Sequence, residues 1–155
     1  MNQITTQYVT ENGACYEQYV ITDPAAKTSL TITPERGGMI TGFTLDGDEY
    51  IWTRRPNFSE CNRPRFGVPV LFPSCGNPDG GVHNFDGKAY PMETHGFADL
   101  CGWDVESVGP DGVTLALEST PLTKFLYPFD FTLLVNYNLE GNKAAISLRS
   151  EERRV

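Results

Sequence analysis

The sequence lacks the features that mark membrane-spanning and nucleic-acid-binding proteins. No apolar run among its 155 residues reaches the length that a bilayer requires, and the N-terminus has neither a basic leader nor an apolar stretch of signal-peptide length. Basic residues are scarce, because 12 Lys and Arg face 20 Asp and Glu, for a net charge of −8. Such a field repels phosphate backbones and anionic lipids. We therefore expect a soluble, cytoplasmic chain that binds neither nucleic acid nor membranes.

Paired cysteines are also missing. Cys15, Cys61, Cys75 and Cys101 form no Cys-x-x-Cys motif, and a chain of this size without a secretion signal does not need disulfide bonds. We expect free thiols. A zinc site built from Cys61, Cys75, Cys101 and His83 is an alternative, although it lacks the short paired spacing typical of structural zinc sites. The sequence therefore predicts neither a metal nor a cofactor.

Helical periodicity is the third absence. No stretch of a dozen residues has a helical pattern free of glycine and proline, and eleven prolines and fifteen glycines imply many short connections. Ala14 to Thr22, Thr28 to Thr33 and Met39 to Leu45 instead combine β-branched and aromatic residues with partial alternation, which predicts strands. We expect an all-β protein with little helix.

Glycine-containing turns predict three hairpins, since glycine supplies the positive backbone angle of a tight reversal. The turns and their flanking strands are Asp46-Gly47 between Met39–Leu45 and Glu49–Thr53, Asp86-Gly87 between His83–Phe85 and Ala89–Met92, and Pro110-Asp111-Gly112 between Trp103–Val108 and Val113–Glu118.

The end of the chain predicts a fourth hairpin and a charged segment. Phe129–Leu139 alternates apolar with mostly polar residues and faces Ala144–Leu148 across Glu140-Gly141-Asn142. We expect an antiparallel β-sandwich domain over residues 1–148 and a charged segment, 149–155, that does not pack and frays. The strand at Ala144–Leu148 would leave an exposed sheet edge, through which the chain could form an oligomer.

The most unusual residues lie between Arg65 and Trp103. They comprise Arg65-Phe66-Gly67-Val68-Pro69-Val70-Leu71-Phe72-Pro73-Ser74-Cys75-Gly76-Asn77, followed by His95-Gly96-Phe97-Ala98 and Trp103. Prolines at 69 and 73 exclude a helix and favour an extended segment at a sheet edge or bend.

These motifs resemble the aldose 1-epimerase, or galactose mutarotase-like, superfamily, particularly its branch related to hexose-6-phosphate mutarotases. That pattern is Arg-Gly-Gly-Ile-Pro-x-x-Phe-Pro-x-x-Gly, then His-Gly-Phe-Ala-Arg and a tryptophan. Pro34-Glu35-Arg36-Gly37-Gly38 and Tyr127-Pro128-Phe129-Asp130-Phe131 also resemble the family. The resemblance implies the N-terminal portion of the mutarotase-like supersandwich, which is longer in the family.

The resemblance implies an isomerase that interconverts the α and β anomers of a small-molecule aldose by acid/base ring opening. A positioned acid and a positioned base are both needed, because either proton transfer alone would build up charge. In the family, later strands carry the general acid histidine and the general base glutamate, and this sequence stops before both positions. The alternative is a non-catalytic carbohydrate-binding or residual β-sandwich fragment.

The resemblance places Arg65, Asn77 and His95 at the sugar site, with His95 as the catalytic candidate. A guanidinium at Arg65 suits adjacent hydroxyls or a phosphate. The alternative is a solvated surface charge, like Arg63 nearby. The family arginine after His-Gly-Phe-Ala is Asp99 here. An anion beside an anionic ligand is repulsive, which favours a neutral aldose over a phosphorylated one.

Overall fold

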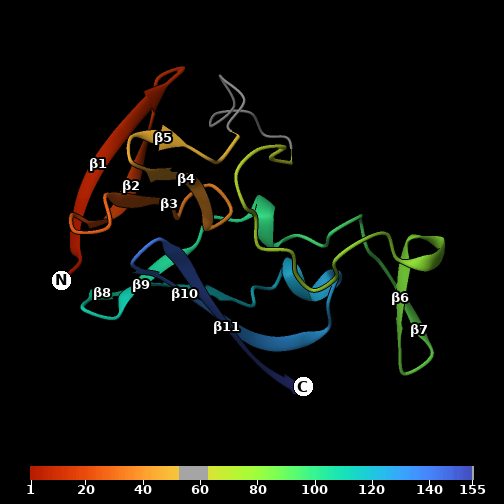
Figure 1. Ribbon diagram of the computed structural model, residues 1–155. Coiled ribbons are helices and arrows are strands. Elements are labelled where there is room, and N and C mark those ends of the chain that lie inside the picture. The colour runs from red at the N-terminus through yellow and green to blue at the C-terminus, as the bar shows by residue number, and fades with distance from the viewer. Residues whose placement is uncertain (53–62, 155) are drawn as a thin grey trace.

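A computed structural model describes residues 1–52 and 63–154, and its regular structure is almost entirely strand (Figure 1). The strands are β1 (Gln3–Glu11), β2 (Ala14–Asp23), β3 (Thr28–Thr33), β4 (Met39–Leu45), β5 (Asp48–Glu49), β6 (Val82–Phe85), β7 (Lys88–Pro91), β8 (Asp104–Gly109), β9 (Gly112–Glu118), β10 (Phe129–Glu140) and β11 (Lys143–Arg154). Three short 3-10 helices connect them: η1 (Asp79–Gly81), η2 (Ala98–Leu100) and η3 (Thr123–Phe125). The predicted all-β class is confirmed. None of the helices in the described ranges has the length and apolar character to cross a bilayer.

The strands form two main antiparallel sheets and a small hairpin. One sheet has the order β1-β2-β3-β4-β5, the other β11-β10-β9-β8, and β6 pairs with β7 in a ribbon that projects to one side in Figure 1. Side chains from both main sheets share one core, as expected of a sandwich. Its buried members include Ile21, Leu30, Ile32 and Ile40 from the first sheet, and Val113, Leu115, Phe131, Leu133, Val135 and Tyr137 from the second.

Three hairpin turns have positive φ at both central residues, as type I′ turns require. Asp46-Gly47 and Asp86-Gly87 are two of them, so both predicted turns are confirmed. After Asp46-Gly47 the second strand, β5, is only Asp48–Glu49 and not the predicted Glu49–Thr53, of which Thr53 lies outside the described residues. The third, Asn12-Gly13, joins β1 to β2. Strand β1 is an element that the sequence reasoning did not predict, although Asn-Gly is a strong hairpin dipeptide.

The fourth predicted hairpin is present and longer than expected. Strand β10 buries alternate residues as predicted, and β11 pairs with it from Lys143 to Arg154. The expectation that the chain frays after residue 148 is wrong for residues 149–154. Antiparallel pairing uses backbone groups and needs no apolar side chain, so Arg149 and Glu151 stay solvated while their backbones pair.

The turn after β3 links the two main sheets. The Tyr137 hydroxyl on β10 donates a hydrogen bond to the Gly38 carbonyl at 2.6 Å, and the Trp103 backbone N–H donates to the Pro34 carbonyl at 3.1 Å. A Cβ atom on Gly38 would lie 2.8 Å from the Trp103 ring, so only glycine fits. Burial raises the pKa of Tyr137, which keeps this donor protonated.

The segment from Arg65 to Asn77 contains no helix, as predicted, but bends at Phe66-Gly67 and Cys75-Gly76 interrupt the expected extended course. Val68 forms an antiparallel bridge with Ile40 of β4, and Phe72 forms a parallel bridge with Gly96. The segment thus runs from the five-stranded sheet to the turn that contains His95.

Candidate functional site

Residues 93–99 are here called the His95 turn. The backbone of this turn packs against Phe72, which lies far from it in sequence. His95 has φ 71° and Gly96 has φ 74°, the left-handed region that favours glycine. Both Phe97 and Ala98 donate their backbone N–H to the Phe72 carbonyl, at 2.9 and 3.2 Å. A Cβ on Gly96 would lie 2.2 Å from that carbonyl oxygen. The glycine after the histidine is therefore required by close backbone contact.

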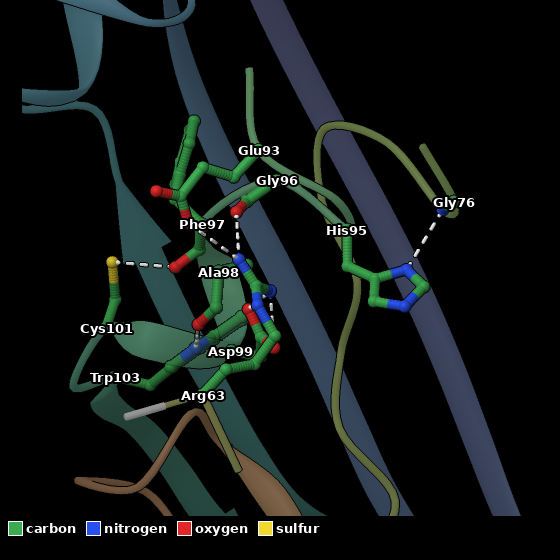
Figure 2. Close-up of polar contacts among 10 residues, drawn as sticks. All are labelled: Arg63, Gly76, Glu93, His95, Gly96, Phe97, Ala98, Asp99, Cys101 and Trp103. Atoms are coloured by element: carbon green, nitrogen blue, oxygen red, sulfur yellow. Dashed lines mark hydrogen bonds and ion pairs between the residues drawn. The ribbon is translucent and has the colours of Figure 1, made fainter. Parts of the chain in front are cut away.

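The imidazole of His95 is held by reciprocal bonds to one residue. The His95 backbone N–H donates to the Gly76 carbonyl at 2.8 Å, and the Gly76 N–H donates to His95 Nδ1 at 3.0 Å. An Nδ1 that accepts a hydrogen bond carries no proton, so the neutral ring has its N–H at Nε2. Figure 2 shows the ring pointing toward Gly76 and away from Arg63 and Asp99. The half-buried His95 therefore presents a hydrogen-bond donor with a defined direction.

Asn77 and His95 belong to two loops that hydrogen bonds join. The Thr94 hydroxyl donates to Asn77 Oδ1 at 2.7 Å, next to the two bonds between Gly76 and His95. Asn77 is exposed. The structure thus brings two of the predicted site residues, Asn77 and His95, to adjoining loops.

Arg65 is exposed and lies in a different hollow. That hollow, about 330 Å³, also includes Tyr50 and Trp52, whose relative exposures are 61% and 67%. Within residues 1–52 and 63–154, no hydrogen bond or ion pair joins Arg65 to His95 or Asn77. The placement of Arg65 at the same sugar site stays a prediction.

Arg63 holds the His95 turn, a role that the sequence reasoning missed. Its Nη1 donates to both carboxylate oxygens of Asp99, at 2.5 and 2.7 Å, and its Nη2 donates to the Gly96 carbonyl at 2.8 Å (Figure 2). Nη2 also lies 3.7 Å from Glu93 Oε2. One guanidinium therefore contacts the beginning, middle and end of the turn, an arrangement that suits its planar fork.

Asp99 is the buried half of this ion pair. Its side chain is 1% exposed, against 22% for Arg63. Burial raises the pKa of the Asp99 carboxyl, and the Arg63 guanidinium acts in the opposite direction. The argument that Asp99 would repel a phosphorylated sugar is therefore wrong, because the carboxylate is buried and Arg63 balances its charge.

The described cysteines are free and dispersed. Cys15 and Cys75 are exposed, and the Cys101 thiol donates to the Phe97 carbonyl at 3.3 Å. In residues 1–52 and 63–154, no group of three or more His, Cys, Asp or Glu could hold a metal ion. Cys61, one member of the alternative zinc set, lies outside the described residues.

A mostly apolar cavity of about 360 Å³ adjoins the His95 turn. Its lining consists of Gly81, Pro91, Met92, Glu93, Gly96, Phe97, Leu100 and Leu126. His95 is not part of this lining, so the cavity and the polar donor are separate features of the same turn.

Several solved structures have a similar fold. Among solved structures, the Slr1438 protein of Synechocystis sp. PCC 6803 is 32% identical, with a TM-score of 0.82 over 87% of this chain and 48% of its own. A galactose mutarotase related enzyme of Lactobacillus acidophilus is 26% identical, with a TM-score of 0.76 over 88% of this chain and 44% of its own. Galactose 1-epimerase of Lactobacillus acidophilus NCFM shares the fold at 15% identity, with a TM-score of 0.73 over 98% and 48%.

The chain spans about half the length of these solved structures. No curated protein matches it. The aldose 1-epimerase family model matches residues 17–154, which include most of β2, all of β3 through β11 and the whole His95 turn. By that match the chain belongs to the aldose 1-epimerase family.

Proposed function

We propose that this chain binds an aldose through Arg65, Asn77 and His95, and that it supplies part of an aldose 1-epimerase site. The observation that carries the proposal is the fixed tautomer of His95, whose Nδ1 accepts from Gly76 and whose Nε2–H is left to donate. A sugar ring oxygen or hydroxyl is a suitable acceptor for this donor.

Interconversion of the anomers needs proton removal from the hydroxyl on carbon 1 and proton donation to the ring oxygen. A hydrogen bond from His95 Nε2 to the ring oxygen would stabilise the charge that develops there when the ring opens. The second proton transfer needs another group. Glu93 and Asp99, the carboxylates of the His95 turn, both lie in ion pairs with Arg63. We infer that the usual acid–base pair lies outside these 155 residues, and that the chain alone accelerates anomer exchange very little.

A non-catalytic carbohydrate-binding chain is the second candidate. The burial of Asp99 favours it, because this carboxylate is 1% exposed and paired with Arg63, so it is not available to a bound sugar as a base. Both candidates require that His95 contact sugar, and they differ only in turnover.

The test compares the purified chain with His95→Ala and with His83→Ala, which removes the only other histidine. Saturation-transfer NMR with glucose or galactose measures binding, and polarimetry of freshly dissolved α-D-glucose measures anomer exchange. We expect binding that His95→Ala abolishes and His83→Ala preserves, with little acceleration by any of the three chains.

Two outcomes would change the proposal. Absence of sugar binding by the unmodified chain would refute it. Robust acceleration that disappears only in His95→Ala would show that these 155 residues contain a complete acid–base site, and would exclude the non-catalytic candidate.

A further inference from the structure

The direction of the His95 side chain depends on an uncommon backbone conformation. His95 has φ 71° and Gly96 has φ 74°, both in the left-handed region that residues with a Cβ rarely adopt. Such a conformation persists only where the surrounding structure holds the neighbouring peptide groups. Because the backbone sets the direction of the Cα–Cβ bond, the contacts that hold these peptide groups also determine where His95 Nε2 points.

Contacts hold the peptide groups on both sides of His95-Gly96. On the preceding side, the His95 backbone N–H donates to the Gly76 carbonyl at 2.8 Å. On the following side, the Gly96 carbonyl accepts from Arg63 Nη2 at 2.8 Å, and the Phe97 N–H donates to the Phe72 carbonyl at 2.9 Å. Figure 2 shows Gly76 and Arg63 on opposite sides of the turn. The peptide group that joins Gly96 to Phe97 therefore has both of its polar groups bonded, the C=O by Arg63.

The Arg63 guanidinium is itself held in place by the buried end of the turn. Its Nη1 donates to both carboxylate oxygens of Asp99, at 2.5 and 2.7 Å, and the Asp99 side chain is 1% exposed. The Asp99 backbone packs closely on Gly37, where a Cβ would lie 2.5 Å from the Asp99 carbonyl oxygen. Asp99 is thus a fixed anchor, from which Arg63 reaches back to the Gly96 carbonyl.

We propose that Arg63 is a positioning residue for the sugar contact of His95, and that it acts through the Gly96 carbonyl. The inference rests on the proposed function, because it concerns how the donor at His95 Nε2 is aimed. The ring of His95 points away from Arg63 in Figure 2, so the guanidinium acts through the backbone of the turn and not by sharing the contact that His95 makes.

A role in charge balance alone is the competing explanation. In that case Arg63 would only neutralise the buried Asp99 carboxylate, and any cation in its place would serve. Arg63→Lys separates the two roles, because an ammonium keeps the positive charge but offers one donor centre where the planar guanidinium offers two separate nitrogens. The variant should keep the ion pair with Asp99 and lose the bond to the Gly96 carbonyl.

The first test measures amide hydrogen exchange by NMR in the parent chain and in Arg63→Lys. We expect the Gly76 amide, which donates to His95 Nδ1 at 3.0 Å, to exchange about fivefold faster or more in the variant. The Val68 amide is the internal control, since it donates to the Ile40 carbonyl at 2.9 Å in the same connecting segment. Its rate should not change, whereas a general loss of stability would accelerate both amides.

The second test measures the dissociation constant for glucose or galactose by NMR titration. We expect it to rise about fivefold or more in Arg63→Lys, because the donor of His95 is no longer aimed. Thr28→Val is the matched control. It removes another bond from a side chain to a backbone carbonyl, from Thr28 Oγ1 to Gly141 at 2.7 Å, in the turn between β10 and β11. It should lower the free energy of unfolding and leave sugar affinity unchanged.

The two tests separate this inference from the proposed function. The exchange measurement needs no sugar, so absence of binding by the unmodified chain would refute the proposed function, whereas an unchanged Gly76 rate in Arg63→Lys would refute the positioning role. Faster exchange of Gly76 with unchanged sugar affinity would also overturn the inference, because loosening the turn would then not affect the contact with sugar.

Discussion

The chain's two histidines lie in two very different settings. His83 lies on the regular strand β6, and its ring packs edge to face on Phe85 at a centroid distance of 5.8 Å. His95 has a left-handed backbone, and Gly76 bonds both its amide and its ring. The first is held by packing, the second by directed hydrogen bonds. Directed bonds fix the proton position as well as the ring, which suits the donor role that we propose for His95.

The two reversals beside these histidines differ in the same way. The Asp86-Gly87 turn is local, with two paired strands of four residues around it. The His95 turn depends on Phe72, Gly76 and Arg63, which lie far from it in sequence. Long-range contacts should therefore dominate its stability, and the following predictions test this contrast in order of expected effect.

The largest difference is expected between Gly96→Ala and Gly87→Ala. Both glycines have positive φ, 74° and 78°, so both substitutions introduce similar backbone strain, about 1 to 2 kcal/mol. A Cβ on Gly96 also meets the Phe72 carbonyl oxygen at 2.2 Å, whereas Gly87 has nothing within 4 Å. We expect Gly96→Ala to lower the free energy of unfolding by about 4 kcal/mol or more in urea titrations. Equal losses in the two variants would contradict the contrast.

Arg63→Ala is expected to have the next largest effect. It leaves the Asp99 carboxylate, 1% exposed, without its partner, and breaking a buried pair in this way costs about 3 kcal/mol. Lys27→Ala is the control, because its pair with Asp46 is exposed on both sides and such pairs contribute about 1 kcal/mol or less.

The same variant has a predicted pH dependence. Burial raises the pKa of Asp99 above its ordinary 3.8, and removing Arg63 removes the opposing effect. The folded state then binds the proton more tightly than the unfolded state, so stability is greatest at low pH and falls as pH rises through the folded-state pKa. The deficit of Arg63→Ala relative to the parent chain should therefore grow from acidic to neutral pH. A deficit that shrinks over that range would show that Asp99 is not the responsible group.

The smallest expected difference is in which ring nitrogen of each histidine carries the proton, and it does not affect the free energy of unfolding. Long-range ¹H–¹⁵N NMR correlations distinguish the two neutral tautomers of histidine. We expect His95 to be entirely the Nε2–H form at a pH where it is neutral, because Gly76 donates to its Nδ1. His83 serves as the internal comparison. An Nδ1–H form of His95 would remove the basis for its proposed role as a donor at Nε2.

Local signals in the sequence were sufficient for most of the strands. Asp-Gly dipeptides located two hairpins, and the alternation from Phe129 to Tyr137 located β10, because the period of two follows directly from strand geometry. Strand β1 was not predicted, because its Thr and Gln residues are solvated and give little alternation between apolar and polar positions. The Asn12-Gly13 turn that follows it was nevertheless visible in the sequence. The end of β11 was not predicted either, because its charged residues show no such alternation.

The candidate site was only partly predictable. His95 and Asn77 came from the family motif, and the structure brings them to adjoining loops. The Arg63 to Asp99 pair spans 36 positions, and nothing local distinguishes a buried arginine from a solvated one. The sequence contained one signal for this pair. Asp99 stands where the family has an arginine, and a carboxylate buried at that position needs a cationic partner.

The hydrogen bond from Tyr137 to Gly38 couples the unfolding of the two main sheets. Because it ties β10 to the turn beside β3, neither sheet can separate without exposing the core face of the other and leaving a buried hydroxyl without an acceptor. The sheets should therefore melt together, with far-ultraviolet and near-ultraviolet circular dichroism reporting one coincident transition. Backbone amides of β3 and β10 should likewise exchange with solvent deuterium at rates set by a single global opening.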